Sequence, residues 1–217
     1  MEGKFIKGAF VEFVPTFLGT TPNVIVFQFN PETIQHNWSQ AQSEAPAMEG
    51  GGANPLGVKG YPGETLSFTI AMEATDQLAK GNPIARASGI YSRLAALEML
   101  LYPTKDVAGE LALEGRSVPP MQLPTVLFVW GPGRILPVRV SSLNITEKLY
   151  DSLLNPTHAE AVITLDVLTP SELEFVSGPL AAVAKKAYTY SQRKREALAV
   201  ANLSNSAESI IGMIETI

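Results

Sequence analysis

Residues 64–72 read ETLSFTIAM, and their apolar side chains alternate with small or polar ones. An alternation of this kind predicts a β-strand with one buried and one open face. Residues 159–168 repeat the pattern, with apolar side chains at every second position from Ala161 to Val167. These two stretches indicate a mainly β fold.

Further strands are expected on both sides of this pair. Residues 4–13 form one, and residues 24–29 are apolar on both faces, as in a central strand that is covered on both sides. Residues 33–40 form a short strand with His36 and Trp38 on one face. Residues 125–130 and 134–148 are joined by Gly131-Pro132-Gly133, which is a plausible hairpin turn.

In the strand expected at residues 134–148, the apolar side chains move from one face to the other halfway along. Val138 and Val140 share one face, whereas Leu143 and Ile145 fall on the other. One extra residue in the strand would restore a continuous apolar face, so we expect a β-bulge near Ser141-Ser142.

Helices are expected in two places. The apolar stripe of residues 88–101 has helical spacing, with Ser88 as the cap and core packing as its purpose. Composition changes after Thr169, and residues 171–217 are expected to be helical, with a break before a last short helix that Asn205-Ser206 would cap. The sequence thus divides into a β domain at 1–169 and a helical extension at 170–217.

Residues 41–63 form a long loop that is rich in glycine and proline. Loops of this length within a domain are usually functional or mobile. Two readings stay open: a flexible surface excursion, or a segment that becomes ordered against a neighbouring subunit.

Composition excludes several classes of protein. The chain has 217 residues, 46% of them hydrophobic, a net charge of −5 and no cysteine. A disulfide framework and a thiol nucleophile are impossible, and wholesale binding of nucleic acid through charge is not expected. No apolar run approaches the roughly 20 residues of a membrane span, and the first residues lack the pattern of a signal peptide, so we expect a cytoplasmic protein without direct membrane insertion.

The sequence offers little chemistry. Residues 52–60 resemble a phosphate-binding loop only loosely, because no Ser or Thr follows the lysine. His36 and His158 lie far apart and are read as structural, and Asp166 near Glu172 lacks a recognisable pocket. We therefore expect no enzyme activity, no cofactor and no metal.

Two segments resemble a known family. They are VIVFQFNPE at residues 24–32, and LFVWG at residues 127–131 followed by a Tyr-Asp turn and a Pro-x-x-Ala entry into the last strand within residues 145–161. Their order and spacing are similar to the tube-protein N-terminal domain family of contractile injection systems, the phage-tail-like particles that include the antifeeding prophage and the Photorhabdus virulence cassettes.

The resemblance implies a tail-tube-like β-barrel or sandwich with one packed helix. It also implies a ring, usually hexameric, with subunits joined edge to edge at the baseplate. The partners would be the spike or hub protein, the inner-tube protein and baseplate wedge proteins, and the role would be a hub adaptor that initiates the tube in the bacterial cytoplasm. The alternatives are an inner-tube subunit and, with less support, a cell-wall glycan-binding or glycan-cleaving protein.

The chain departs from the family after residue 170, where no LysM features occur. The helical tail stands in that place, and its basic residues and apolar end suggest docking to a wedge, sheath or hub subunit. A basic helix is, however, most often simply a solvated face.

Candidate contact residues follow from the motifs and from the tail. Each also has a plain structural reading: Phe29 and Trp38 as core, and Asn30 and Asn155 as turn formers. The full set is Phe29, Asn30, Pro31, Trp38, Tyr150, Asp151, Asn155, Lys185, Lys186, Arg193 and Arg195.

Overall fold

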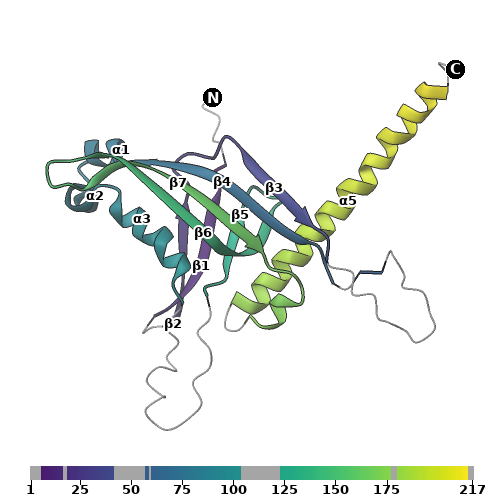
Figure 1. Ribbon diagram of the computed structural model, residues 1–217, viewed down its shortest axis with the longest axis horizontal. Helices are drawn as coiled ribbons and strands as arrows, with labels where there is room; N and C mark the ends of the chain where they lie inside the picture. The colour runs from purple at the N-terminus through teal and green to yellow at the C-terminus, as the bar shows by residue number, and fades with distance from the viewer. Residues whose placement is uncertain are drawn as a thin grey trace, which may run out of the picture.

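The computed structural model describes residues 6–16, 19–41, 57–58, 60–103, 123–176 and 180–214, with the backbone alone for 13–16, 19–20 and 204–214. The expected loop at 41–63 lies largely outside these residues. Figure 1 shows a curved sheet, a group of short helices at one end and a long C-terminal helix at the other.

The described residues form a seven-stranded antiparallel sheet in the order β2-β1-β5-β6-β7-β4-β3. This confirms the mainly β prediction. The strands are β1 (Ala9–Thr16), β2 (Gly19–Val26), β3 (Ile34–Ser39), β4 (Gly63–Glu73), β5 (Val126–Val129), β6 (Ile135–Tyr150) and β7 (Pro156–Val167).

The two stretches with alternating side chains pair with each other. Phe68 of β4 lies opposite Ile163 of β7, and Leu66 lies opposite Leu165. All four side chains are buried, as the alternation predicts. Together, β4 and β7 supply a large part of the core.

The predicted bulge is present in β6. The register with β7 shifts between Val140 and Ser142. Val140 is buried before the shift, and Leu143 and Ile145 pack against the same core after it. One extra residue therefore keeps apolar side chains on the inner face along most of this long strand.

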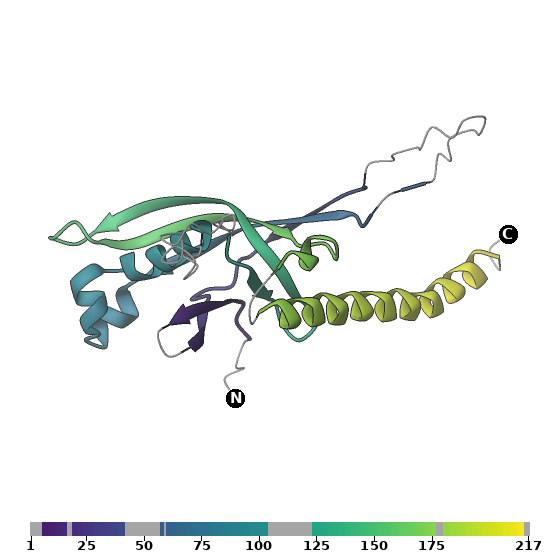
Figure 2. The ribbon, with the colours of Figure 1, turned by 90° about the horizontal axis from the view of Figure 1, so that it is seen from below.

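The sheet folds over on a cluster of phenylalanines. Phe10 of β1 and Phe68 of β4 stack with ring centroids 6.3 Å apart, although three strands separate β1 from β4 in the sheet. Phe128 of β5 lies 5.4 Å from Phe68, and Phe27 lies 5.1 Å from Phe10. Two halves of one sheet thus face each other, as in a sandwich, with β1 and β2 on one side and β4, β6 and β7 on the other (Figure 2).

The central position expected for residues 24–29 is wrong. Strand β2 ends at Val26 and lies at an edge of the sheet, paired only with β1 among the described strands. The side chains of Val24 and Val26 are 52% and 56% exposed. An apolar run on both faces cannot reveal whether a helix, another strand or a second molecule is to cover it.

The helix expected at residues 88–101 is present but begins later, at Tyr91, and its last turn is a 3₁₀ helix. Helix α2 (Pro83–Ser88) ends at Gly89, which has a φ of 56°, and helix α3 (Tyr91–Glu98) and the 3₁₀ helix η1 (Met99–Leu101) follow. Ser88 does not cap α3, because it is the last residue of α2 and its hydroxyl donates to the Ile84 carbonyl oxygen. The apolar stripe itself does pack into the core.

Glycine is required at the break between α2 and α3. A Cβ at position 89 would lie 2.1 Å from the Pro156 carbonyl oxygen. The next amide, that of Ile90, donates to the same oxygen at 2.8 Å. The close approach fixes the start of α3 against the start of β7. A short helix α1 (Thr75–Ala79) precedes α2.

The tail begins with the 3₁₀ helix η3 (Glu172–Glu174) and continues as α5 (Leu180–Ile214). Leu180, Ala184 and Ala187 are buried against Leu127 of β5 and neighbouring apolar residues. The second half of α5 extends away from the sheet (Figures 1 and 2).

The break expected near Asn205-Ser206 is wrong, because α5 runs through it. No glycine or proline occurs between Leu180 and Ile211, so nothing in the covalent chain forces the helix to stop.

The first turns of α5 are part of the folded body, and this can be tested with two leucines of the same helix. Leu180 is 5% exposed and Leu198 is 62% exposed. We expect Leu180→Ala to lower the free energy of unfolding by about 2–4 kcal/mol, because it leaves a cavity. Leu198→Ala should change it by less than about 0.5 kcal/mol. Urea unfolding measures both, and equal effects would contradict this packing.

Candidate functional site at the junction of the sheet and α5

The ends of β3 and β4 meet the middle of α5 in a polar junction. In the antiparallel ladder, Trp38 of β3 lies opposite Glu64 of β4, and His36 lies opposite Leu66. These side chains continue the inner face of the sheet beyond its apolar core. Glu64 is only 7% exposed, so its carboxylate needs a partner.

Arg195 of α5 supplies that partner. Its Nη2 donates to both carboxylate oxygens of Glu64, at 3.1 and 2.9 Å. Its guanidinium carbon lies 5.9 Å from the centroid of the Trp38 ring, in a cation–π contact. Hydrogen bonds between charged groups are stronger than neutral ones, so this contact holds α5 firmly against the β3–β4 end.

His36 completes the junction. Its ring stacks on Trp38 with centroids 5.3 Å apart, and its Nδ1 lies 3.6 Å from Glu64 Oε1. That distance is too long for a hydrogen bond, and the buried Nδ1 has no hydrogen-bond partner among the described residues. Burial lowers the pKa of His36, and the nearby Arg134 and Arg195 also lower the pKa, while Glu64 opposes this shift.

Two further contacts place α5 on the start of β6. The Tyr190 hydroxyl donates to the Pro132 carbonyl oxygen at 2.7 Å. The Ser191 hydroxyl accepts from the Ile135 amide at 3.0 Å and donates to the Ile135 carbonyl oxygen at 2.8 Å. The first part of α5 is thus fixed by apolar packing, by β6 and by Glu64, and residues 197–203 are exposed.

The structure therefore brings together two residues that the sequence nominated for separate reasons, Trp38 and Arg195. Trp38 is 54% exposed, and the reading of this residue as core is wrong. The same holds for Phe29, which is a large exposed hydrophobic residue.

Asn30 and Pro31 lie apart from this junction. The Asn30 side chain donates to the Ile6 carbonyl oxygen and accepts from the Gly8 amide, both at 2.9 Å. It thus ties the segment after β2 to the start of the chain, which is the turn role considered above. Phe29, Asn30 and Pro31 together line part of an open hollow on the surface.

Tyr150, Asp151 and Asn155 shape the turn between β6 and β7. Asp151 Oδ1 accepts from the amides of Leu153 and Asn155 at 2.8 and 2.9 Å. Asp151 Oδ2 accepts from Asn155 Nδ2 at 2.9 Å, and these bonds lower the pKa of Asp151. The turn presents Leu153 and Leu154 to solvent, and Tyr150 is exposed beside them.

Lys185, Lys186 and Arg193 are exposed on α5. None forms an ion pair with another described residue, in contrast to Arg195. Docking of this basic face to an acidic partner remains a prediction.

Glu64 was missed at the level of the sequence, although a signal was present. It falls in phase with Leu66, Phe68, Ile70 and Met72, on the face that the alternation marks as buried. A carboxylate on the buried face of a strand is expected to be a buried charge. Such a charge needs a cation, which must come from elsewhere in the chain.

The junction is suited to holding elements together. Across the described ranges, no group of three or more His, Asp or Glu side chains is placed to hold a metal ion. No helix in those ranges is long and apolar enough to cross a membrane.

No family model matches the chain, and no curated protein matches it.

The contact between Glu64 and Arg195 can be measured by a double-mutant cycle. Arg195→Met leaves a buried carboxylate without its partner and should lower the free energy of unfolding by about 1–3 kcal/mol. In a Glu64→Gln background the same change should have a much smaller effect. Arg193→Met, on the exposed side of the helix, is the matched control. Additive effects of the two substitutions would contradict a direct interaction.

The lowered pKa of His36 makes the stability of the folded protein depend on pH. Its pKa is lowered in the folded protein, so the unfolded chain binds the proton more readily. Its contribution to stability is complete above about pH 6.5, the unfolded pKa, and is lost as the pH falls from there to the folded pKa. Between pH 7.5 and 5.5, the wild type should lose more unfolding free energy than His36→Gln, by at most about 1.4 kcal/mol per pH unit. Parallel losses in urea titrations would exclude this role.

Proposed function

We propose that this chain is a structural adaptor in the baseplate hub of a contractile injection system, where it links the spike to the inner tube and initiates the tube. The ordered motifs at residues 24–32 and 127–161 support the assignment, together with the mainly β fold. The particle would be assembled in the bacterial cytoplasm.

The observation that carries the proposal is the pair of open sheet edges. Within the described part of the chain, β2 and β3 each pair with a strand on one side only. Neither strand contains Asp, Glu, Lys or Arg, and both display exposed hydrophobic residues, Val24 and Val26 on β2 and Trp38 on β3. Monomeric β proteins usually protect such edges with charges or proline. Pro22 lies in the first half of β2, but Asn23–Val26 and β3 have neither, so these edges suit contacts with other subunits.

The topology limits how copies can join. Six antiparallel steps separate β2 from β3 in the strand order, so the two edge strands have the same sense. A β2-to-β3 contact between copies would join one edge of the sheet to the opposite edge of the next copy. Contacts of this head-to-tail kind use two different surfaces and generate rings when the rotation closes, which is compatible with the proposed hexamer.

The projecting part of α5 favours an adaptor over an inner-tube subunit. Residues 197–214 continue the helix for about 27 Å beyond the junction with the sheet. A tube subunit that stacks many times gains from being compact, whereas an adaptor can use an arm to reach a wedge, sheath or hub protein. The exposed Lys185, Lys186 and Arg193 would assist docking on an acidic surface.

Co-expression with neighbouring spike and tube genes tests the function. Affinity purification followed by native mass measurement should recover about six copies bound to the spike, and this complex should nucleate rings of the tube protein. A monomer that binds neither protein would refute the proposal, and glycan binding and hydrolysis would then be measured.

A truncation tests the arm separately. Removal of residues 171–217 would also remove Leu180 and its buried neighbours, so it would confuse folding with docking. We expect a chain that ends at Glu196 to keep its urea midpoint within about 0.5 M, because the side chains of residues 197–203 are exposed. The same chain should lose recruitment of the wedge or hub partner, and normal assembly without the arm would contradict this role.

A further inference from the structure

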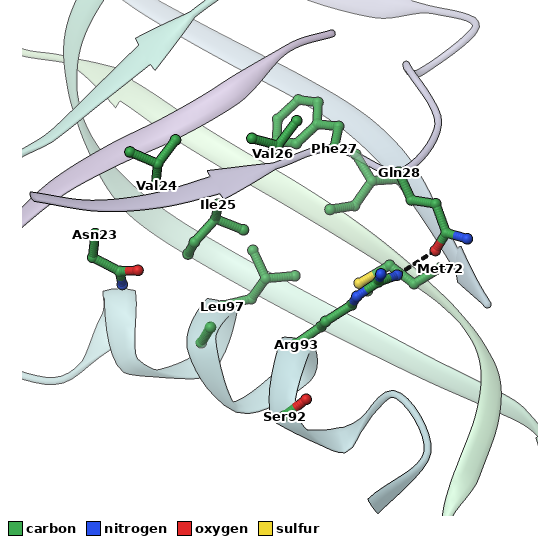
Figure 3. Close-up of a pocket in the computed structure, with 12 residues that line it drawn as sticks. Asn23, Val24, Ile25, Val26, Phe27, Gln28, Met72, Ser92, Arg93 and Leu97 are labelled. Carbon is green, nitrogen blue, oxygen red and sulfur yellow. Dashed lines mark hydrogen bonds between the residues drawn. The ribbon is translucent and has the colours of Figure 1, made fainter. Parts of the chain in front are cut away.

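A groove runs between helix α3 and β2, the edge strand that pairs only with β1 among the described strands. It encloses about 270 Å³, and Figure 3 shows its lining. Ile25, Met72 and Leu97 provide apolar walls, and Val24 and Val26 also border the groove, with side chains on the face of β2 opposite to Ile25 (Figure 3). This edge strand therefore adjoins a hollow that has apolar walls and a few polar groups.

One cation lies in this groove. The half-buried Arg93 of α3 donates to Gln28 Oε1, which also accepts from the Glu73 amide at 3.0 Å. No described carboxylate forms an ion pair with Arg93. A guanidinium has five N–H donors, so the one acceptor among the described residues leaves most of its binding capacity unused there. Burial lowers the pKa of Arg93, as expected for a cation without a compensating anion.

A comparison with the hollow beside Asn30 shows what is unusual here. That hollow contains a cation, Lys7, but its lining also includes the carboxylates of Glu32 and Glu160. The lining of the β2–α3 groove contains Arg93 and no Asp or Glu. Its charge is therefore complementary to an anion from outside the described fold.

We propose that the groove binds an extended segment of a partner chain, and that this segment places an Asp or Glu carboxylate on Arg93. Its backbone would follow β2 beside Asn23–Val26, on the side where no described strand pairs with it, by strand addition. Side chains two positions before and after the carboxylate point to the same face and would contact the apolar walls. This inference rests on the proposed function only in treating the β2 edge as a surface for protein contacts, and it adds the chemistry of the partner.

Binding of two synthetic peptides to the full-length chain tests the proposal. Both are capped nonapeptides of alternating Val and Thr, Val-Thr-Val-Thr-X-Thr-Val-Thr-Val, with Glu or Gln at X. Fluorescence anisotropy at low salt should show the Glu peptide binding at least about tenfold more tightly than the Gln peptide, since a partly buried ion pair is formed. Equal affinities, or no binding of the Glu peptide at millimolar concentration, would overturn the proposal.

Three variants locate the effect. Arg93→Gln should reduce binding of the Glu peptide to the level of the Gln peptide, and Arg93→Lys should retain part of the preference because it keeps the charge. Arg86→Gln, an exposed arginine on the preceding helix, is the matched control and should leave the preference unchanged. A Glu preference that survives in Arg93→Gln would place the site elsewhere.

The outcome is separate from that of the particle assay. If the chain fails to assemble with spike and tube but keeps the preference for the Glu peptide, the proposed function is wrong and the groove assignment stands. If it assembles normally and shows no preference, only the groove assignment fails.

Discussion

The packing of Phe10, Phe27, Phe68 and Phe128 is the interaction on which the rest of the structure depends. These rings bind two halves of one sheet to each other, although β1 and β4 are not neighbours in the strand order. Burial of four such side chains is a large apolar gain, since each removes on the order of 150–250 Å² from water. The sheet folds over without closing into a barrel. The strands at its two ends, β2 and β3, therefore remain edge strands, whereas a closed barrel would have no edges.

A second constraint comes from Glu64. Glu64 lies on the same face of β4 as Leu66 and the other buried side chains of this strand. An unpaired charge is unfavourable there. Arg195 meets that requirement from a position 131 residues later in the chain. The direction of α5 is thus set by an electrostatic need of the sheet as well as by the apolar contacts of Leu180 and its neighbours.

Much of the fold could be predicted from the sequence, because short-range periodicity reports burial directly. The alternation of β4 and β7 and the bulge after Val140 are of this kind. Two errors arose where the outcome depends on distant contacts: the edge position of β2, and the later start of α3, beyond Gly89 and its contact with the Pro156 carbonyl oxygen. The break expected in α5 instead gave a local capping pattern too much weight in a segment without glycine or proline. The junction shows the same limit, since Trp38 and Arg195 were nominated separately and only the folded sheet reveals that they touch.

Arg195 and Arg93 differ in how their charges are compensated. Arg195 forms hydrogen bonds with Glu64 in the same molecule, and its guanidinium also lies over the Trp38 ring in the junction. Among the described residues, Arg93 donates to the side-chain oxygen of Gln28 and forms no ion pair, beside a groove with apolar walls and an edge of β2 that pairs with no described strand. Retaining a cation there is unfavourable for the isolated subunit, since burial disfavours its charged form without a compensating anion. An anion placed on Arg93 would compensate for this cost, which is why the ligand proposed for the β2–α3 groove carries a carboxylate.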